Sequence, residues 1–134
     1  MYEIIPFKSV GPFEFKKSID NYLSTYDMVF TPKTSEDDWN TYSYKDGALD
    51  IYTGDDLIIT SIACRGDCFM KGEILTGMNI NSFFSKFEID KNKIKMEKVA
   101  FFDEREEDVY DIDDWGLQLW VDKFDEIITV FAAD

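Results

Sequence analysis

The sequence predicts an α+β fold, in which two tandem helix–β-hairpin units form one antiparallel sheet with both short helices packed on one face. Three observations predict it. Two stretches share one amphipathic helix pattern, two later stretches share one hairpin pattern, and each helix precedes its hairpin in the chain. Units of this size cannot bury their apolar faces alone, so a shared sheet is expected. The 134 residues fit a single domain, 1–134, with no Pro- or Gly-rich linker between the units.

Each predicted helix begins at a polar N-cap residue and continues with apolar residues at the spacing i, i+3, i+4 and i+7. The first helix starts at Ser18 and the second at Asn79. The apolar positions are Ile19, Tyr22, Leu23 and Tyr26 in the first helix, and Ile80, Phe83, Phe84 and Phe87 in the second. A Ser or Asn side chain at the N-cap accepts a backbone N–H of the first turn. The spacing places the apolar residues on one buried stripe.

Each predicted hairpin consists of two strands in which Leu or Ile alternates with polar or amphipathic residues, joined by a short turn. The strands are residues 47–52 and 57–62 in the first unit, and 116–120 and 127–131 in the second. The second strand of both hairpins carries the sequence Ile-Ile-Thr at the same place after the turn. This agreement indicates a duplication.

The remaining parts of each unit complete the predicted order. A long loop is expected between each helix and its hairpin. Strands are expected ahead of the helices at Tyr2–Ile5 and Phe69–Ile74. The two pseudo-repeats therefore span approximately 10–65 and 72–133.

The charge of the chain is its strongest functional signal. It has 28 acidic and 14 basic side chains and no histidine, which gives a formal net charge of −14. Solubility alone needs a magnitude of only about 2–8. The chain is also 45% apolar and 16% aromatic, so the acidity belongs to a folded domain and not to a disordered tail. A negative surface disfavours nucleic acid and anionic membranes and speeds the encounter with basic proteins. An acidic proteome, such as that of a salt-adapted cell, is the alternative explanation.

The sequence indicates a cytoplasmic protein. No apolar stretch approaches the ~18–20 residues that cross a bilayer, and residues 1–6 do not resemble a signal peptide. Cys64 and Cys68 are too few for a disulfide scaffold and are separated by three residues, whereas redox and zinc motifs have two. We expect both to be reduced residues of the core or of a turn.

Two acidic stretches that each end in a tryptophan are the candidate binding residues. The longer one contains Asp103, Glu104, Glu106, Glu107, Asp108, Asp111, Asp113, Asp114 and Trp115. The shorter one contains Glu36, Asp37, Asp38 and Trp39, and is expected to occupy the equivalent loop of the first unit. Carboxylates bind the Lys and Arg side chains of a partner, and a tryptophan can anchor a desolvated pocket. The alternative is a pair of solvated loops whose tryptophans cover the core.

The sequence offers little for catalysis or for metal binding, so no enzyme activity, cofactor or metal site is expected. Without histidine there is no ready base near neutral pH and no histidine-activated nucleophile. Gly-rich phosphate-binding loops are absent. Asp111, Asp113, Gly116 and Asp122 match part of a calcium-loop pattern. However, Trp115 stands at a ligand position of that pattern and its last ligand is Asp where a bidentate Glu is needed.

Both ends of the chain resemble small bacterial immunity proteins, including those of contact-dependent growth inhibition. The resemblance lies in Ile5-Pro6, in Val10-Gly11-Pro12 ahead of a Ser-capped helix, and in 115–121 followed by 127–131. Lys16-Lys17 stands where Gly-Met is usual, although Thr76-Gly77-Met78-Asn79 keeps that form in the second unit. The resemblance implies a cytosolic antitoxin that blocks one toxin domain, often a basic nuclease, and it brings no catalytic residues.

The leading hypothesis is therefore a cytoplasmic immunity protein that binds and neutralises a basic toxin domain, such as a nuclease, through its acidic loops. A nuclease groove is positive because it holds phosphates, and an acidic surface can occupy it. Two alternatives remain: an acidic mimic of nucleic acid that inhibits a DNA-binding enzyme, and a general protein-interaction module. The expected partner is a protein, and neither nucleic acid nor a membrane.

Overall fold

A large antiparallel sheet of eight strands forms the centre of the computed structural model, which describes residues 1–134. Its strand order is β10-β11-β12-β13-β7-β6-β5-β4. The bounds are β4 (Met28–Thr31), β5 (Asn40–Tyr44), β6 (Leu49–Thr53), β7 (Ile59–Cys64), β10 (Lys95–Ala100), β11 (Glu106–Ile112), β12 (Leu117–Val121) and β13 (Ile127–Ala133). Both predicted hairpins are present, as β6–β7 and β12–β13, and they meet where β7 pairs with β13.

A second, smaller sheet has the order β3-β2-β1-β8-β9, so the expectation of a single sheet is wrong. Its strands are β1 (Tyr2–Ile5), β2 (Ser9–Val10), β3 (Phe13–Glu14), β8 (Cys68–Met70) and β9 (Glu73–Ile74). β1 pairs with β8 in parallel, and the other pairs are antiparallel. The helices are α1 (Asp20–Leu23) and α2 (Ile80–Lys86), and two 3₁₀ turns are η1 (Lys91–Lys93) and η2 (Asp113–Trp115).

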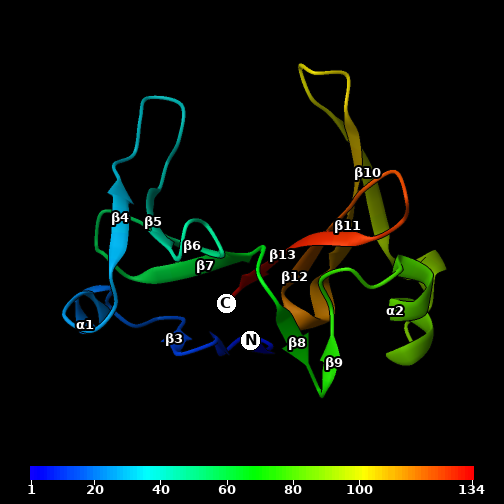
Figure 1. Cartoon of the computed structure of the whole chain (residues 1–134), viewed down its shortest axis with the longest axis horizontal. Coiled ribbons are helices and arrows are strands. Elements are labelled where there is room, and N and C mark those ends of the chain that lie inside the picture. Colours follow the sequence, from blue (N-terminus) through cyan, green and yellow to red (C-terminus); the bar gives the residue numbers. More distant parts are fainter.

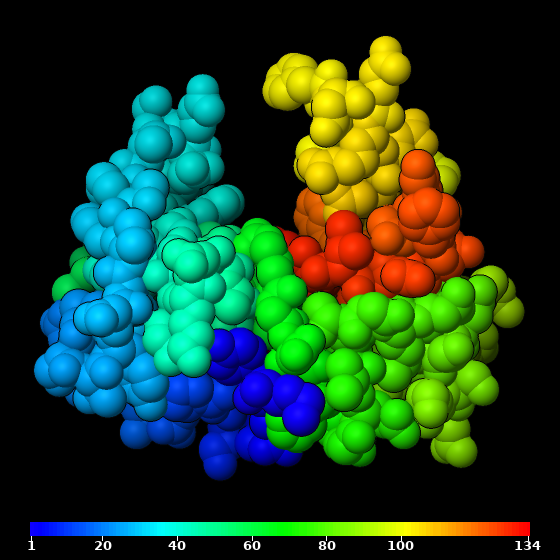
Figure 2. Space-filling view, in the orientation of Figure 1, coloured from blue at the N-terminus to red at the C-terminus, as the bar shows by residue number.

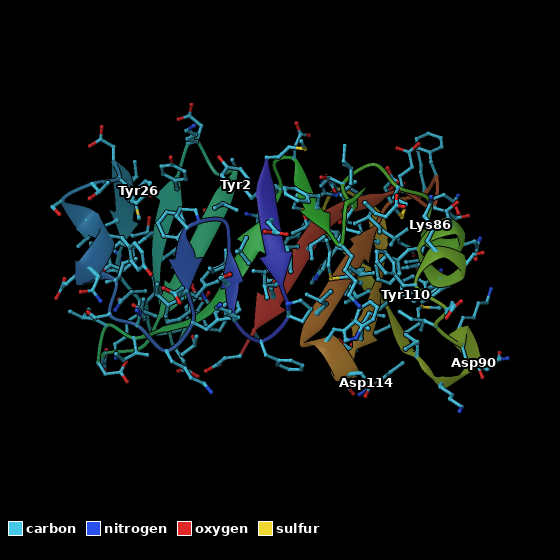
Figure 3. All side chains as sticks on the ribbon, turned by 90° about the horizontal axis from the view of Figure 1, so that it is seen from below. Tyr2, Tyr26, Lys86, Asp90, Tyr110 and Asp114 are labelled. Atoms are coloured by element: carbon cyan, nitrogen blue, oxygen red, sulfur yellow. The ribbon has the colours of Figure 1, made fainter.

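The helices and the small sheet form one layer against one face of the large sheet. Figure 1 shows α1, the small sheet and α2 below the large sheet, and Figure 3, seen from below, shows the small sheet between the two helices. The core lies between these layers and includes Phe13, Leu49, Ile51, Phe83 and Leu119, all buried. The fold is thus α+β, mostly strands, in two sheets with two short helices.

The small sheet arises because the segments ahead of the helices fold into tight hairpins. Residues 69–74, expected as one strand, reverse at Lys71 and Gly72, whose positive φ values of 52° and 81° suit a two-residue hairpin turn. Val10, Phe13 and Met70 then point into the core and cover the large sheet. Strands of two or three residues give too little periodicity to be predicted from sequence.

The two stretches expected as long loops instead extend the large sheet. Each forms a hairpin, β4–β5 in the first half and β10–β11 in the second. β5 reads Asn-Thr-Tyr-Ser-Tyr, and the aromatic and β-branched residues in it favour an extended strand. The prediction missed these strands because nearly all residues of β4, β5 and β10 are exposed or half-exposed, so no alternation of apolar and polar residues marks a buried face.

The second helix agrees with its prediction and the first does so in part. The Asn79 side chain accepts the N–H of Asn81 at 2.9 Å, and Ile80, Phe83 and Phe84 are buried. The first helix has only one turn. Its Leu23 is 42% exposed, although Ser18 accepts the N–H of Asp20 at 3.2 Å.

The two halves of the large sheet repeat the same register. Adding 68 to each number turns the pair Tyr42↔Ile51 into Tyr110↔Leu119, and Thr53↔Ile59 into Val121↔Ile127. Both halves also have a register shift at the same place, between Tyr52 and Thr53 and between Trp120 and Val121. We call positions related in this way equivalent. Ala63 and Phe131 are equivalent and pair with each other, so they lie at the centre of the arrangement.

Candidate protein-binding site

Two hairpin arms enclose the free face of the large sheet. The β4–β5 and β10–β11 hairpins both rise on the side opposite the helices (Figure 1), and a hollow lies between them (Figure 2). The tips of the arms are residues 32–39 and 101–105. We call the surface between the arms the concave face.

Five aromatic side chains, which we call the aromatic row, form a continuous chain of contacts across the concave face. They are Trp39, Tyr52, Phe131, Trp120 and Phe101. Their ring centroids are separated in that order by 5.9, 6.2, 5.8 and 6.4 Å. The row begins at the tip of one arm and ends at the tip of the other.

Strand alternation places the aromatic row on the concave face. In β12 the side chains of Leu117, Leu119 and Val121 are buried in the core, so Gln118 and Trp120 point the opposite way. The indole Nε1–H of Trp120 donates to Gln118 Oε1 at 2.9 Å, and the Gln118 amide donates to Asp111 at 2.9 Å. Tyr52 holds the position in β6 equivalent to Trp120, and burial raises the pKa of its hydroxyl above the ordinary value.

Both arginines of the chain lie in one pocket at the centre of this face. The pocket has a volume of about 490 Å³ and is lined by Arg65, Arg105, Phe101, Trp120 and Phe131, among others. We call it the aromatic pocket. Arg65 Nη1 donates to Asp50 at 2.5 Å, and the Arg105 guanidinium lies 4.3 Å from the centroid of the Phe101 ring. In a chain of this charge, a pocket that is lined by both guanidiniums and three aromatic rings differs from the rest of the surface.

A second pocket of about 560 Å³ adjoins the first and is strongly acidic. It lies between the tip of the β10–β11 arm and the β12–β13 turn. Its carboxylates are those of Asp103, Glu104, Glu106, Glu107 and Asp122. Phe124 and Ile128 supply its apolar wall, and Arg105 and Lys123 are its cations. The two pockets share Arg105, Glu107 and Ile128, so they form one continuous depression. We call the second one the acidic pocket.

The structure divides the longer predicted acidic stretch between two places. Asp103, Glu104, Glu106 and Glu107 surround the acidic pocket. Asp113, Asp114 and Trp115 form η2 at the other end of β11. A seven-residue strand is about 20 Å long, so η2 lies about that far from the acidic pocket. There Trp115 packs against Phe87, the C-cap residue of α2, at 5.5 Å between ring centroids, and Lys71 lies over the Trp115 ring. Figure 3, which views the molecule from the side of the helices, shows Asp114 at the margin of the molecule.

The two remaining carboxylates of that stretch lie within β11 and face opposite ways. Asp111 points to the concave face, where it accepts the Gln118 amide. Asp108 points away from it and accepts Lys98 Nζ at 3.0 Å. Only the first of them therefore lies on the surface between the arms.

The shorter acidic stretch lies at the tip of the other arm. Glu36, Asp37 and Asp38 are exposed, and Trp39 is 46% exposed at the end of the aromatic row. The expectation that the two acidic stretches occupy equivalent loops holds for the first part of the longer stretch, because adding 68 turns Glu36, Asp37 and Asp38 into Glu104, Arg105 and Glu106 at the tip of the other arm. It is wrong for the two tryptophans, because Trp115 lies in η2, between β11 and β12. The position equivalent to Trp39 is Glu107, since their neighbours Asn40 and Asp108 pair with the equivalent residues Thr53 and Val121.

Several side chains of this surface were not predicted. They are Tyr52, Arg65, Phe101, Phe102, Arg105, Trp120, Phe124 and Phe131. Phe102 is fully exposed at the arm tip and Phe124 is 67% exposed in the β12–β13 turn. Two adjacent phenylalanines directly ahead of an acidic turn were the available sequence signal. The rest depends on strand register, which brings together residues from both halves of the chain.

No group of three or more Cys, Asp or Glu side chains in the structure is placed to hold a metal ion. None of the helices combines the length and the apolar character needed to cross a membrane. Comparisons of the chain with models of known protein families, with curated protein sequences and with solved structures find no match.

Proposed function

We propose that this chain is a cytoplasmic immunity protein that binds a basic toxin domain and blocks it, without catalysing a reaction itself. One observation carries the proposal: two arms with acidic tips enclose a concave face whose floor is a row of five aromatic rings. Aromatic residues that are at least half-exposed and surrounded by a charged rim have the composition of a protein interface.

The charge distribution supports a basic partner. Glu36, Asp37 and Asp38 stand on one arm tip and Asp103 and Glu104 on the other, so a partner approaching the concave face passes between two negative regions. Such rims raise the association rate with basic proteins and repel acidic ones. A toxin that cleaves nucleic acid needs a positive groove, which matches this field.

The aromatic floor favours a protein partner surface over mimicry of nucleic acid. A mimic needs carboxylates spaced along the surface that takes the place of phosphates. Here carboxylates stand at both arm tips, and the aromatic side chains of Tyr52, Phe131 and Trp120 lie between the tips. Aromatic residues at the centre of an interface supply most of the binding energy.

We further propose that the two halves of the chain descend from one helix–hairpin unit. Matching register pairs and matching register shifts support this. The strands join their helices in the same way: Ile19 N–H donates to the Leu57 carbonyl, and Ile80 N–H donates to the Asp125 carbonyl. The duplication accounts for a surface with two arms.

The test uses the product of the gene adjacent to that of this chain, which the proposal expects to contain the toxin domain. The purified toxin is expected to bind and to lose its activity in proportion to the chain added. Replacing Asp103 by Asn and Glu104 and Glu106 by Gln should slow association several-fold at low salt. The control is Asp113→Asn with Asp114→Asn, which removes acids at the far end of β11 and should leave the rate within about twofold. Equal rates for both variants, or binding without inhibition, would contradict the proposal.

A further inference from the structure

Glu107 is a largely buried side chain whose carboxylate has no hydrogen bond within the chain and still reaches solvent. The residue is 6% exposed, and its side chain lines both the acidic and the aromatic pocket. Its one ionic contact in the chain is with Arg105, whose Nε lies 3.7 Å from Oε2, beyond the usual hydrogen-bond distance. The carboxylate therefore faces the depression with its acceptor positions free.

The residues around Glu107 remove most of the hydration of this side chain, and no donor of the chain replaces the lost hydrogen bonds. Arg105 does not fill this role, because its Nε is also 3.9 Å from Asp103 and its guanidinium stacks on Phe101. A donor that enters from outside would satisfy Glu107 at the junction of the two pockets.

The depression exists because the two arms differ at this position. The equivalent position on the other arm is Trp39, whose indole packs on Tyr52. A carboxylate is much smaller than an indole, and both pockets open around Glu107. At equivalent positions, the β4–β5 arm thus has an indole packed on Tyr52, and the β10–β11 arm has a carboxylate beside an open acidic pocket.

The aromatic walls of the depression already hold cations from the chain itself. The Arg105 guanidinium lies over Phe101, and Lys123 Nζ lies 5.1 Å from the centroid of the exposed Phe124 ring. Aromatic faces beside carboxylates bind guanidinium groups through cation–π attraction and charge-assisted hydrogen bonds. These internal contacts show which chemistry the depression accepts.

We propose that the acidic pocket receives an arginine side chain of the partner, with Glu107 accepting its guanidinium N–H groups and Phe124 covering it. This deepens the function proposed above and rests on it. Arginine fits better than lysine because its planar group can contact a ring face and donate to a carboxylate at the same time.

The test uses acetylated hexa-arginine and hexalysine peptides as probes, titrated into the full chain at low salt. Hexa-arginine is expected to bind more tightly and to shift the NMR signals of Glu107, Trp120 and Phe124. Glu107→Gln, which keeps the shape of the side chain, should weaken the binding of hexa-arginine about tenfold or more, since a hydrogen bond to a charged group is lost. Asp108→Asn is the matched control, because it removes the same charge from the neighbouring residue on the other face of β11.

Phe124→Ala provides a second variant at an exposed position that the fold does not need. It should weaken the binding of hexa-arginine several-fold while the melting temperature of the chain stays unchanged. Equal effects of Glu107→Gln and Asp108→Asn, equal affinity for both peptides, or shifts confined to the other arm would overturn the inference. Because no toxin is present, these results are independent of the proposed function. A toxin that is inhibited equally by Glu107→Gln and by the unchanged chain would refute the arginine contact alone.

Discussion

At the scale of single residues, comparing equivalent positions of the two halves identifies a buried side chain that lowers stability. Thr53 is fully buried, and its hydroxyl Oγ1 has no hydrogen-bond partner. The equivalent residue is Val121, which has the same shape without a polar atom and is also fully buried. The hydroxyl therefore costs stability and contributes no contact of its own.

We predict that Thr53→Val stabilises the protein by about 1 kcal/mol, because it removes an unsatisfied buried hydroxyl. Denaturant unfolding monitored by circular dichroism gives the change. The reciprocal substitution Val121→Thr should lower the free energy of unfolding by about 1–3 kcal/mol. A loss of stability in Thr53→Val would show that the hydroxyl is satisfied in solution.

At the scale of elements, the two tryptophans that end the acidic stretches have different roles. Trp115 contacts Phe83 and Phe87, and so it links η2 to α2. Trp39 contacts only Tyr52 among the aromatic residues and ends the aromatic row. The sequence alone does not distinguish the two tryptophans, because each follows a run of acidic residues. The sheet places one beside the helix and the other on the concave face.

We predict that Trp115→Ala lowers the free energy of unfolding by about 1–3 kcal/mol and leaves toxin affinity unchanged for the folded fraction. Trp39→Ala should instead weaken toxin binding and leave the stability nearly unchanged. Its stability should change by less than about 1 kcal/mol, while toxin dissociation becomes about 30-fold faster, as for a residue that contributes about 2 kcal/mol to binding. Thermal melts and surface plasmon resonance measure the two quantities. The opposite pattern would place the interface beside α2.

Long periodic elements could be predicted from the sequence, whereas short or half-exposed ones could not. The helix at Ile80–Lys86 and the strands β6, β7, β12 and β13 follow from clear apolar spacing. The two-residue strands β2, β3 and β9 leave no periodic signal. The candidate site was predicted only at its rim, because acidic residues are evident in sequence. Its floor combines Tyr52, Trp120 and Phe131 from three strands, and only the register reveals that they touch.

At the scale of the whole molecule, the core and the proposed binding surface lie on opposite faces of the large sheet. One face of the large sheet packs against the small sheet and the helices and carries the core. The other face carries the aromatic row, both arginines and the acidic pocket. The arms belong to the edges of the sheet, so they can vary in length and charge without disturbing the core.

Hydrogen exchange of the chain, free and bound to the proposed toxin partner, tests the central claim most directly, because it locates the interface without any substitution. We predict that the toxin slows exchange in both arms, at residues 36–43 and 99–110, and in the β12–β13 turn that borders the acidic pocket. Exchange in α1, in η1 and in the small sheet should be unchanged. Protection confined to the helices and the small sheet, with both arms exchanging as in the free chain, would contradict the assignment of the concave face as the binding surface.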